Sequence, residues 1–376
     1  MELQPQPLNS TTDTNRIKAL DGLRGISIGL VLLSHAGLGH WVPGGLGVTI
    51  FFFISGYIIT RLLLREQEMT GAIDVPAFYF RRAFRILPVL LTFLAVCTAY
   101  IQWYFGLFEP WKLLSAVVNF YNYFHIYFLD QSGLAGVLDP YGIVWTLAVE
   151  EHFYFIYPFL CYLLLARRHR LAQLLAVVCI AALVWRAYLV LGVGLDALPA
   201  ERIYKATDTR IDSVAFGALF ALIRATSASG VHTYYQDAKW PFAAGLLLLL
   251  ATLTVRNEEF RQSLRYSLQG VALCLMFCKL VEQPGRVAAW LSGKTLVHLG
   301  KISYSLYLWH WLVKIVLENS SASTWPNAAR HATMICVSLL VAQLSYRVLE
   351  QPMLRKGQAF LLRRAQIRNT EPPPKH

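Results

Sequence analysis

Charged residues are scarce in this chain of 376 residues, because Asp, Glu, Lys and Arg make up only 15% of it. A soluble domain usually contains about 25%. Hydrophobic residues account for 56%, which excludes an ordinary water-soluble globular domain. Several apolar windows run for about 17–22 residues, long enough to cross a hydrocarbon core of about 30 Å as helices. The composition therefore predicts an all-α integral membrane protein embedded in the lipid bilayer.

Cysteine is also rare, with six residues that all lie in apolar segments and none spaced as in a CxxC metal motif. This pattern argues against a disulfide framework and a zinc site, so we expect no metal. The first residues, MELQPQPLNSTTDTN, lack the basic start and apolar core of a removable signal peptide. We therefore expect the first span to be an uncleaved anchor.

The formal net charge of +12 would be compatible with nucleic-acid binding. However, the basic residues form short clusters at the ends of apolar segments, as the positive-inside rule of membrane proteins describes. We therefore expect no nucleic-acid partner.

Eleven apolar windows are candidate spans, at 20–38, 46–64, 86–106, 111–128, 143–166, 171–194, 211–224, 241–255, 264–281, 302–318 and 330–349. The window 111–128 is the weakest, because it is rich in Tyr, Asn and His and the loop after it has no Lys or Arg. If it is re-entrant or interfacial, about ten transmembrane helices remain, both termini are cytoplasmic, and most basic clusters face the cytoplasm. The expected organisation is a polar tail (1–15), a membrane domain (16–355) and a basic cytoplasmic tail (356–376).

The first span carries three ionisable residues, Asp21, Arg24 and His35. Such residues cost a few kcal/mol or more at membrane depth and usually face a partner or a cavity, so they are candidates for a functional site. Asp21 and Arg24 are three residues apart on one helical face. His35 lies about 16 Å further along, on nearly the same face. The structural alternative is a snorkelling Arg24 paired with Asp21, with His35 at the outer interface.

The fifth span contains the adjacent Glu150 and Glu151. Neighbouring helical residues point in different directions, so both cannot face one cavity equally. We expect Glu150 to face inward because it shares a face with Tyr154, whereas an ion pair with an arginine is the structural alternative for either glutamate. His310, in the tenth span, is expected at a similar depth, with hydrogen-bonded packing as its alternative.

The segment FYFRRAFRILP, residues 78–88, places Arg82 and Arg85 on one helical face at the cytoplasmic entrance to the third span. This geometry suits the binding of phosphates, although positive-inside anchoring explains such a cluster equally well. A basic mouth and an interior with His and Glu fit an enzyme in which histidine, whose unperturbed pKa is close to neutral, acts as a base. They also fit a proton-coupled transporter or flippase.

Seven segments in this order resemble the acyltransferase 3 family of integral-membrane acyltransferases, over residues 16–355. They are LDGLRGISIGLVLLSH, GVTIFFFISGYIIT, FYFRRAFRILP, VWTLAVEEHFYFIYP, TDTRIDSVAFGALFA, ISYSLYLWHW and SYRVLEQPMLR. The sequence departs from the family pattern at Thr49, where an acidic residue is frequent, and at His152, where glutamine is frequent. Some members carry an added hydrolase-like domain, which we expect this chain to lack.

The resemblance implies a ten-span enzyme of the inner (cytoplasmic) membrane, an acyltransferase transferring groups other than amino-acyl groups. It implies acyl-CoA, usually acetyl-CoA, as the donor and a hydroxyl of a carbohydrate, such as a cell-surface or lipid-linked polysaccharide, as the acceptor. A cytoplasmic small molecule such as a macrolide is the alternative acceptor. The residues that this assigns to catalysis are His35, Arg24 and Glu150; those assigned to donor binding are Arg82 and Arg85; and those expected to support them are Asp21, Glu151, His310 and Ser55.

Overall fold

The computed structural model describes residues 11–128, 139–199, 201–226, 239–283 and 285–370. Within these ranges the fold is helical, without a β-strand. This confirms the predicted all-α class for the described part of the chain. Most of the predicted N-terminal tail (1–10) and the C-terminal EPPPKH (371–376) lie outside it.

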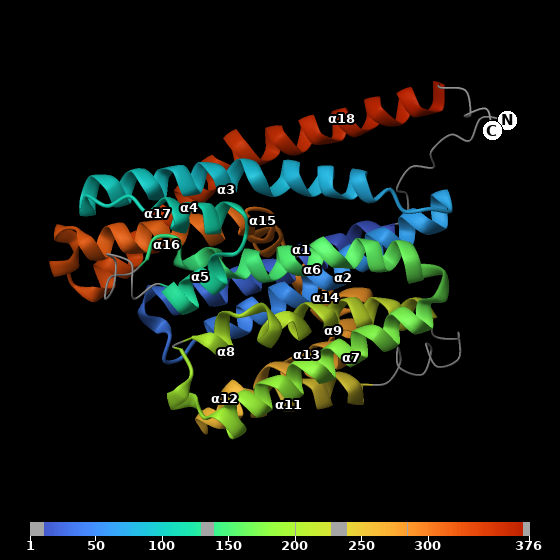
Figure 1. The fold of residues 1–376 in the computed structure, drawn as a ribbon, viewed down its shortest axis with the longest axis horizontal. Coiled ribbons are helices and arrows are strands. Elements are labelled where there is room, and N and C mark those ends of the chain that lie inside the picture. Colours follow the sequence, from blue (N-terminus) through green and yellow to red (C-terminus); the bar gives the residue numbers. More distant parts are fainter. Residues whose placement is uncertain (1–10, 129–138, 200, 227–238, 284, 371–376) are drawn as a thin grey trace.

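Most of the long helices lie side by side along the long axis of the molecule (Figure 1). These are α1 (Thr11–Leu33), α2 (Gly44–Thr70), α3 (Val75–Phe105), α6 (Trp145–Leu164), α7 (Arg168–Ala187), α9 (Thr207–Thr226), α11 (Trp240–Thr254), α13 (Arg265–Phe277), α16 (Ser303–Asn319), α17 (Asn327–Ser345) and α18 (Gln351–Thr370). The shorter helices are α4 (Pro110–Val117), α5 (Tyr121–Phe128), α8 (Arg202–Lys205), α12 (Glu258–Gln262), α14 (Arg286–Leu291) and α15 (Lys294–Lys301).

The turn after α1 and the helix α18 lie at opposite ends of the molecule (Figure 1). At one end α1 passes into a π-helical turn, Ser34–Leu38, and we call this the turn end. At the other end α2 leads into α3 and α18 extends from the bundle, and we call this the α18 end. Glycines in the left-handed conformation terminate α2 at Gly71 and α3 at Gly106, where a side chain would be strained.

Among the described residues, five helical segments are long and apolar enough to cross a membrane, namely Lys18–Leu38, Gly44–Thr70, Val75–Phe105, Gly142–Val193 and Asn327–Arg364. The fourth contains both α6 and α7 and is 52 residues long. These segments support the predicted membrane protein by their length and composition.

The weak window 111–128 is divided between α4 and α5, which have eight residues each. A helix of that length spans only about 12 Å, far less than a hydrocarbon core of about 30 Å. Asn119, with φ of 59°, turns the chain between the two helices. The window therefore forms no continuous helix that could cross a bilayer.

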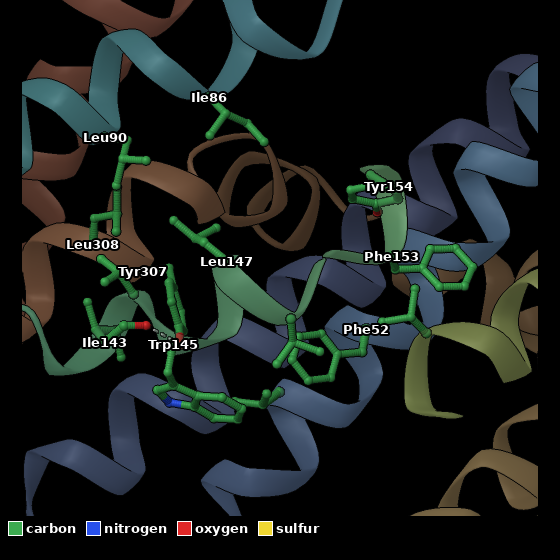
Figure 2. Close-up of a cluster of buried hydrophobic side chains, with 14 of the residues drawn as sticks. Phe52, Ile86, Leu90, Ile143, Trp145, Leu147, Phe153, Tyr154, Tyr307 and Leu308 are labelled. Atoms are coloured by element: carbon green, nitrogen blue, oxygen red, sulfur yellow. Dashed lines mark hydrogen bonds between the residues drawn. The ribbon is translucent and has the colours of Figure 1, made fainter. Parts of the chain in front are cut away.

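A close helix contact holds α2 against α9. Gly56 of α2 lies against the backbone of Val214, and Gly217 of α9 lies against the backbone of Phe53, so that a Cβ at either glycine would overlap a carbonyl group. Small residues allow helices to approach closely in membrane proteins. The adjoining apolar core lies between α2, α3, α6 and α16 and includes Phe52, Leu90 and Leu147 (Figure 2).

A buried ion pair fixes α4 to the segment before α6. The Lys112 side chain is 1% exposed, and its Nζ lies 3.1 Å from Oδ1 of Asp139. We expect Lys112→Met to lower the free energy of unfolding by about 3–5 kcal/mol, because it leaves a buried carboxylate without its cation. Thermal unfolding of the purified protein in detergent measures this change.

The matched control is Lys294→Met, because Lys294 is exposed. Surface substitutions of this kind usually change the free energy of unfolding by less than about 0.5 kcal/mol. Equal unfolding temperatures for the two variants would contradict a stabilising role for the Lys112–Asp139 pair.

Candidate active site

A cavity of about 120 Å³ lies between α1, α2, α3, α6 and α16. It is lined by apolar side chains of α2 and by a set of polar ones from all five helices. The polar lining residues are Arg24, Ser55, Arg82, Arg85, Thr146, Glu150, Tyr154, Ser303, Tyr304 and Tyr307. Ionisable residues far apart in the sequence therefore meet at one place inside the helix bundle, which we call the central cavity.

Two carboxylates and one aromatic ring contact the guanidinium group of Arg82. Its Nε donates to Oε1 of Glu151 at 2.7 Å, and its Nη2 lies 3.4 Å from Oε2 of Glu150. The guanidinium carbon also lies 3.5 Å from the centroid of the Tyr154 ring, whose hydroxyl is hydrogen-bonded to Ser55. Both glutamates of the fifth predicted span thus pair with one arginine, and only Glu150 of the two lines the cavity.

Arg24 and Arg85 face the same cavity without a carboxylate partner in the described residues. Arg24 Nη2 donates to Oγ of Ser303 at 3.0 Å. Within the described ranges Arg24 forms no ion pair with Asp21, so the snorkelling pair considered as an alternative is not formed. Two guanidinium groups are therefore available for an anion in the central cavity.

His35 lies outside the cavity lining and contacts His310 instead. His35 Nδ1 is 3.0 Å from His310 Nε2, and the two rings are stacked with an interplanar angle of 13°. His310 Nδ1 is 2.9 Å from the carbonyl oxygen of Leu306, which can only accept a hydrogen bond. With both rings neutral, His310 must accept from His35 Nδ1–H. This leaves the lone pair of His35 on Nε2, where a base needs it.

The histidine pair adjoins the central cavity. The Tyr307 ring, which lines the cavity, lies 5.9 Å from the ring of His310 between centroids. Tyr307 Oη is held between Thr146 Oγ1 and the carbonyl of Ile143. Arg24 and His35 both contact α16, through Ser303 and His310, in the same chain order. Helix α1 therefore runs alongside α16 in the same direction and presents one polar face to it.

The turn Ser34–Leu38 sets the position of His35. Gly37 has φ of 85°, a conformation that a side chain rarely adopts. A Cβ on Gly37 would also meet the imidazole of His331 from α17. The chain can therefore turn shortly after His35 because residue 37 is glycine, which adopts this conformation without strain and leaves room for His331.

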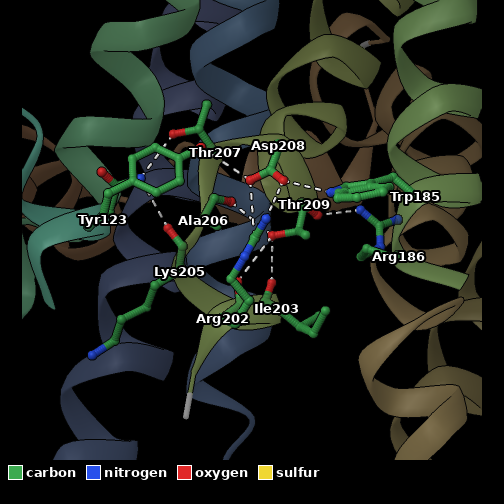
Figure 3. A network of polar contacts seen from close by, with 11 residues as sticks. Tyr123, Trp185, Arg186, Arg202, Ile203, Lys205, Ala206, Thr207, Asp208 and Thr209 are labelled. Atoms are coloured by element: carbon green, nitrogen blue, oxygen red, sulfur yellow. Dashed lines mark hydrogen bonds and ion pairs between the residues drawn. The ribbon is translucent and has the colours of Figure 1, made fainter. Parts of the chain in front are cut away.

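The polar start of α9, within the segment TDTRIDSVAFGALFA, lies in a separate network rather than in the central cavity (Figure 3). Asp208 accepts hydrogen bonds from Arg202 and, at 2.6 Å, from Nε1 of Trp185. Thr207 Oγ1 lies 2.7 Å from Nδ1 of His152, one of the positions that departs from the family pattern. These contacts join α6, α7 and α8 to α9 and have a structural character.

The structure thus gathers Arg24, Arg82, Arg85, Glu150 and Ser55 in one cavity and places His35 with His310 beside it. Glu151 binds Arg82 from outside the lining, and Asp21 does not line the cavity.

Sequence reasoning missed Ser303 and Tyr307, although both stand in the segment ISYSLYLWHW. It also missed Glu350, a buried carboxylate that accepts from Ser305 Oγ at 2.8 Å. The position of Glu350 inside SYRVLEQPMLR was the available signal.

The chain is similar in sequence to known acyltransferases. A family model described as an acyltransferase domain matches residues 17–347. The O-acetyltransferase OatA of Staphylococcus aureus strain NCTC 8325 is 27% identical over 368 residues, covering 91% of this chain and 58% of OatA. A protein of S. aureus strain COL, provisionally named an O-acetyltransferase, is 28% identical over 358 residues with the same coverage. The chain therefore matches less than two thirds of these relatives. No solved structure matches it.

Proposed function

Because the chain belongs to the acyltransferase family whose domain covers residues 17–347, we propose that it is a membrane O-acyltransferase. It transfers an acyl group, acetyl in the simplest case, from acyl-CoA to a hydroxyl of a carbohydrate such as a cell-surface or lipid-linked polysaccharide. The observation that carries this proposal is the central cavity, which Arg24 and Arg85 line without a carboxylate partner among the described residues, next to a paired histidine.

We propose ten spans, formed by α1, α2, α3, α6, α7, α9, α11, α13, α16 and α17. Charge supports this count, because it leaves the α18 end, with its basic C-terminal helix, in the cytoplasm. The turn end then faces away from the cytoplasm. The membrane domain covers 16–355, between a polar tail (1–15) and a basic tail (356–376), and the protein resides in the inner membrane.

The donor binds in the central cavity with its phosphates on Arg85 and Arg24. This assignment modifies the expectation that Arg82 and Arg85 grip the donor together, because both glutamates already engage Arg82. Arg82 instead holds Glu150 and Glu151 in place between α3 and α6. Arginine suits this task because its planar fork matches phosphate oxygens.

His35 acts as the general base on the acceptor hydroxyl, through Nε2. The hydroxyl oxygen forms a bond to the thioester carbonyl carbon as its proton passes to His35, and the carbon–sulfur bond then breaks. The departing thiolate takes the proton from His35, which returns the imidazole to its neutral form. Stabilising the negative charge that develops on the carbonyl oxygen is the alternative role of Arg24, because one guanidinium cannot hold the donor phosphates and the distant thioester carbonyl at once. His310 holds His35 in the tautomer that this step needs.

A proton-coupled transporter or flippase would also use buried His and Glu residues. The match to an acyltransferase domain favours acyl transfer. A cytoplasmic small molecule, such as a macrolide, is the alternative acceptor for the same chemistry.

The direct test uses purified protein in detergent with acetyl-CoA labelled in its acetyl group. We expect label to appear on an added oligosaccharide, and the release of free CoA to depend on that acceptor. The matched control is the same preparation carrying His35→Ala. Substrate flux driven by a proton gradient in proteoliposomes, with no consumption of label, would favour the transporter and refute the proposed function.

A further inference from the structure

We propose that a second cavity, at the turn end, binds the acidic portion of a saccharide acceptor that carries carboxylate or phosphate groups. This inference rests on the proposed function, because a saccharide bound here is an acceptor only if the protein transfers acyl groups. The cavity has a volume of about 340 Å³, which is within the usual size of a small-ligand site. We call it the outer cavity.

The outer cavity is adjacent to the segment that carries the proposed base. Its walls come from residues 39–46, which follow the turn Ser34–Leu38, and from the region between α11 and α13. Ser34 also lines it and directly precedes His35 in the chain. A ligand in this cavity therefore lies next to the turn that holds His35.

Three arginines line the outer cavity, and its lining includes no Asp or Glu. Arg261 pairs with Glu258 at 2.7 Å, and Arg265 donates to Oη of Tyr266 at 3.1 Å. Arg256 is exposed and has no hydrogen bond or ion pair within the part of the chain that the structure describes. In the proposed topology this end faces away from the cytoplasm, where the positive-inside rule gives no reason for arginines. The binding of an anionic ligand in the outer cavity is such a reason.

A fourth arginine lies behind the aromatic wall of the cavity. Arg210 is fully buried, and within the described residues its Nε and Nη1 have no hydrogen-bond partner. Its guanidinium carbon lies 3.8 Å from the ring centroid of Tyr266 and 5.5 Å from that of Tyr204, and both rings line the cavity. Arg210 Nη2 donates to the uncharged hydroxyl group of Thr49. The charge of Arg210 is therefore not neutralised by residue 49 and adds to the positive potential behind the wall.

The lining combines these charges with groups that suit a sugar. Trp41 is 88% exposed and offers an aromatic face, while Gln269 and His40 supply hydrogen-bonding groups. Arginine forks bind carboxylates and phosphates in a bidentate manner. An acidic saccharide satisfies the arginines and the aromatic face together, whereas a neutral one leaves the charge without a partner.

Binding without acyl transfer tests the inference. Purified full-length protein in a neutral detergent is titrated, in the absence of acyl-CoA, with a fluorescent hexuronic-acid trimer and with a neutral hexose trimer of equal length. We expect the acidic trimer to bind at least about tenfold more tightly, because charge-assisted hydrogen bonds are stronger than neutral ones. We also expect this preference to weaken as salt is added.

The variant Arg256→Gln with Arg265→Gln is expected to remove most of the preference, since Arg261 is already paired with Glu258. Glutamine at 265 can still donate to Tyr266, and unchanged thermal unfolding verifies the fold. The matched control is Arg330→Gln, because Arg330 is a half-buried arginine of α17 that does not line the cavity. We expect this control to keep the full preference.

Equal binding of the two trimers by the unmodified protein would overturn the proposal. So would a preference that the double substitution leaves undiminished, or binding of phosphatidylglycerol vesicles in place of the acidic trimer, which would mark a lipid headgroup site. The assay needs no donor, so the two proposals fail separately. A preference for the acidic trimer with no label transfer would refute only the acyltransferase function.

Discussion

The variant His35→Ala is expected to lower kcat about 10²–10⁴-fold, the usual contribution of a general base, with little change in the KM for acyl-CoA. The reason is positional, because His35 lies outside the central cavity in which the donor is proposed to bind. Steady-state transfer of labelled acetyl groups measures the effect. Normal kcat in a well-folded His35→Ala variant would refute the role of His35 as the base.

His310 provides a finer test of the same mechanism, because it acts through His35. We expect His310→Leu to lower kcat, since it removes the acceptor for His35 Nδ1–H. His310→Gln should recover part of the lost rate, because an amide oxygen can still accept that hydrogen bond. If His310 had only a structural role, His310→Gln would not recover kcat relative to His310→Leu at equal unfolding temperatures. The substitutions would then change the yield of folded protein rather than kcat.

The second large effect distinguishes two arginines three residues apart in α3. We expect Arg85→Gln to raise the KM for acyl-CoA about 10–100-fold, as expected for the loss of hydrogen bonds to a charged group worth about 1.5–3 kcal/mol. Its unfolding temperature should change little, because within the described residues Arg85 has no ion pair. Donor titration and thermal unfolding of the same preparations give both numbers.

For Arg82→Gln we expect the opposite pattern. Glu150 and Glu151 would lose their common cation, and breaking a buried ion pair costs about 3–5 kcal/mol of stability. The side chains of Arg82, Glu150 and Glu151 are 13%, 17% and 24% exposed, so the cost will lie at or below that range. Adding Glu151→Gln should restore part of the stability. A stable Arg82→Gln variant that binds the donor weakly would contradict this structural role and would show that Arg82 binds the donor.

Parts of the fold could be predicted from the sequence because the bilayer imposes a simple rule. A helix satisfies its own backbone hydrogen bonds, so apolar windows of sufficient length predict helices. The windows at 46–64 and 143–166 became α2 and α6. The polar and aromatic composition of 111–128 identified it as the weakest window, and the structure divides it into two short helices. The rule does not state where a window will break, and this one breaks near Asn119.

The candidate site was predictable residue by residue but not as an arrangement. Charges inside apolar helices are rare enough that Arg24, His35, Arg82 and Glu150 stand out from the sequence. Helical periodicity also placed Arg24 and His35 on one face, and both contact α16. Which side chain meets which depends on how helices distant in the sequence pack together, and periodicity carries no information on that.

The sequence by itself therefore determined the helical class, the ionisable residues that need partners, and the direction in which Glu150 faces. Only the tertiary structure decided that His35 pairs with His310, that Arg82 is shared by two glutamates, and that Arg24 and Arg85 remain for an anion. The physical reason is the range of the interactions. Hydrophobicity and helix periodicity act over a few turns of one helix, whereas a hydrogen bond between residues 35 and 310 exists only after α1 and α16 have packed together.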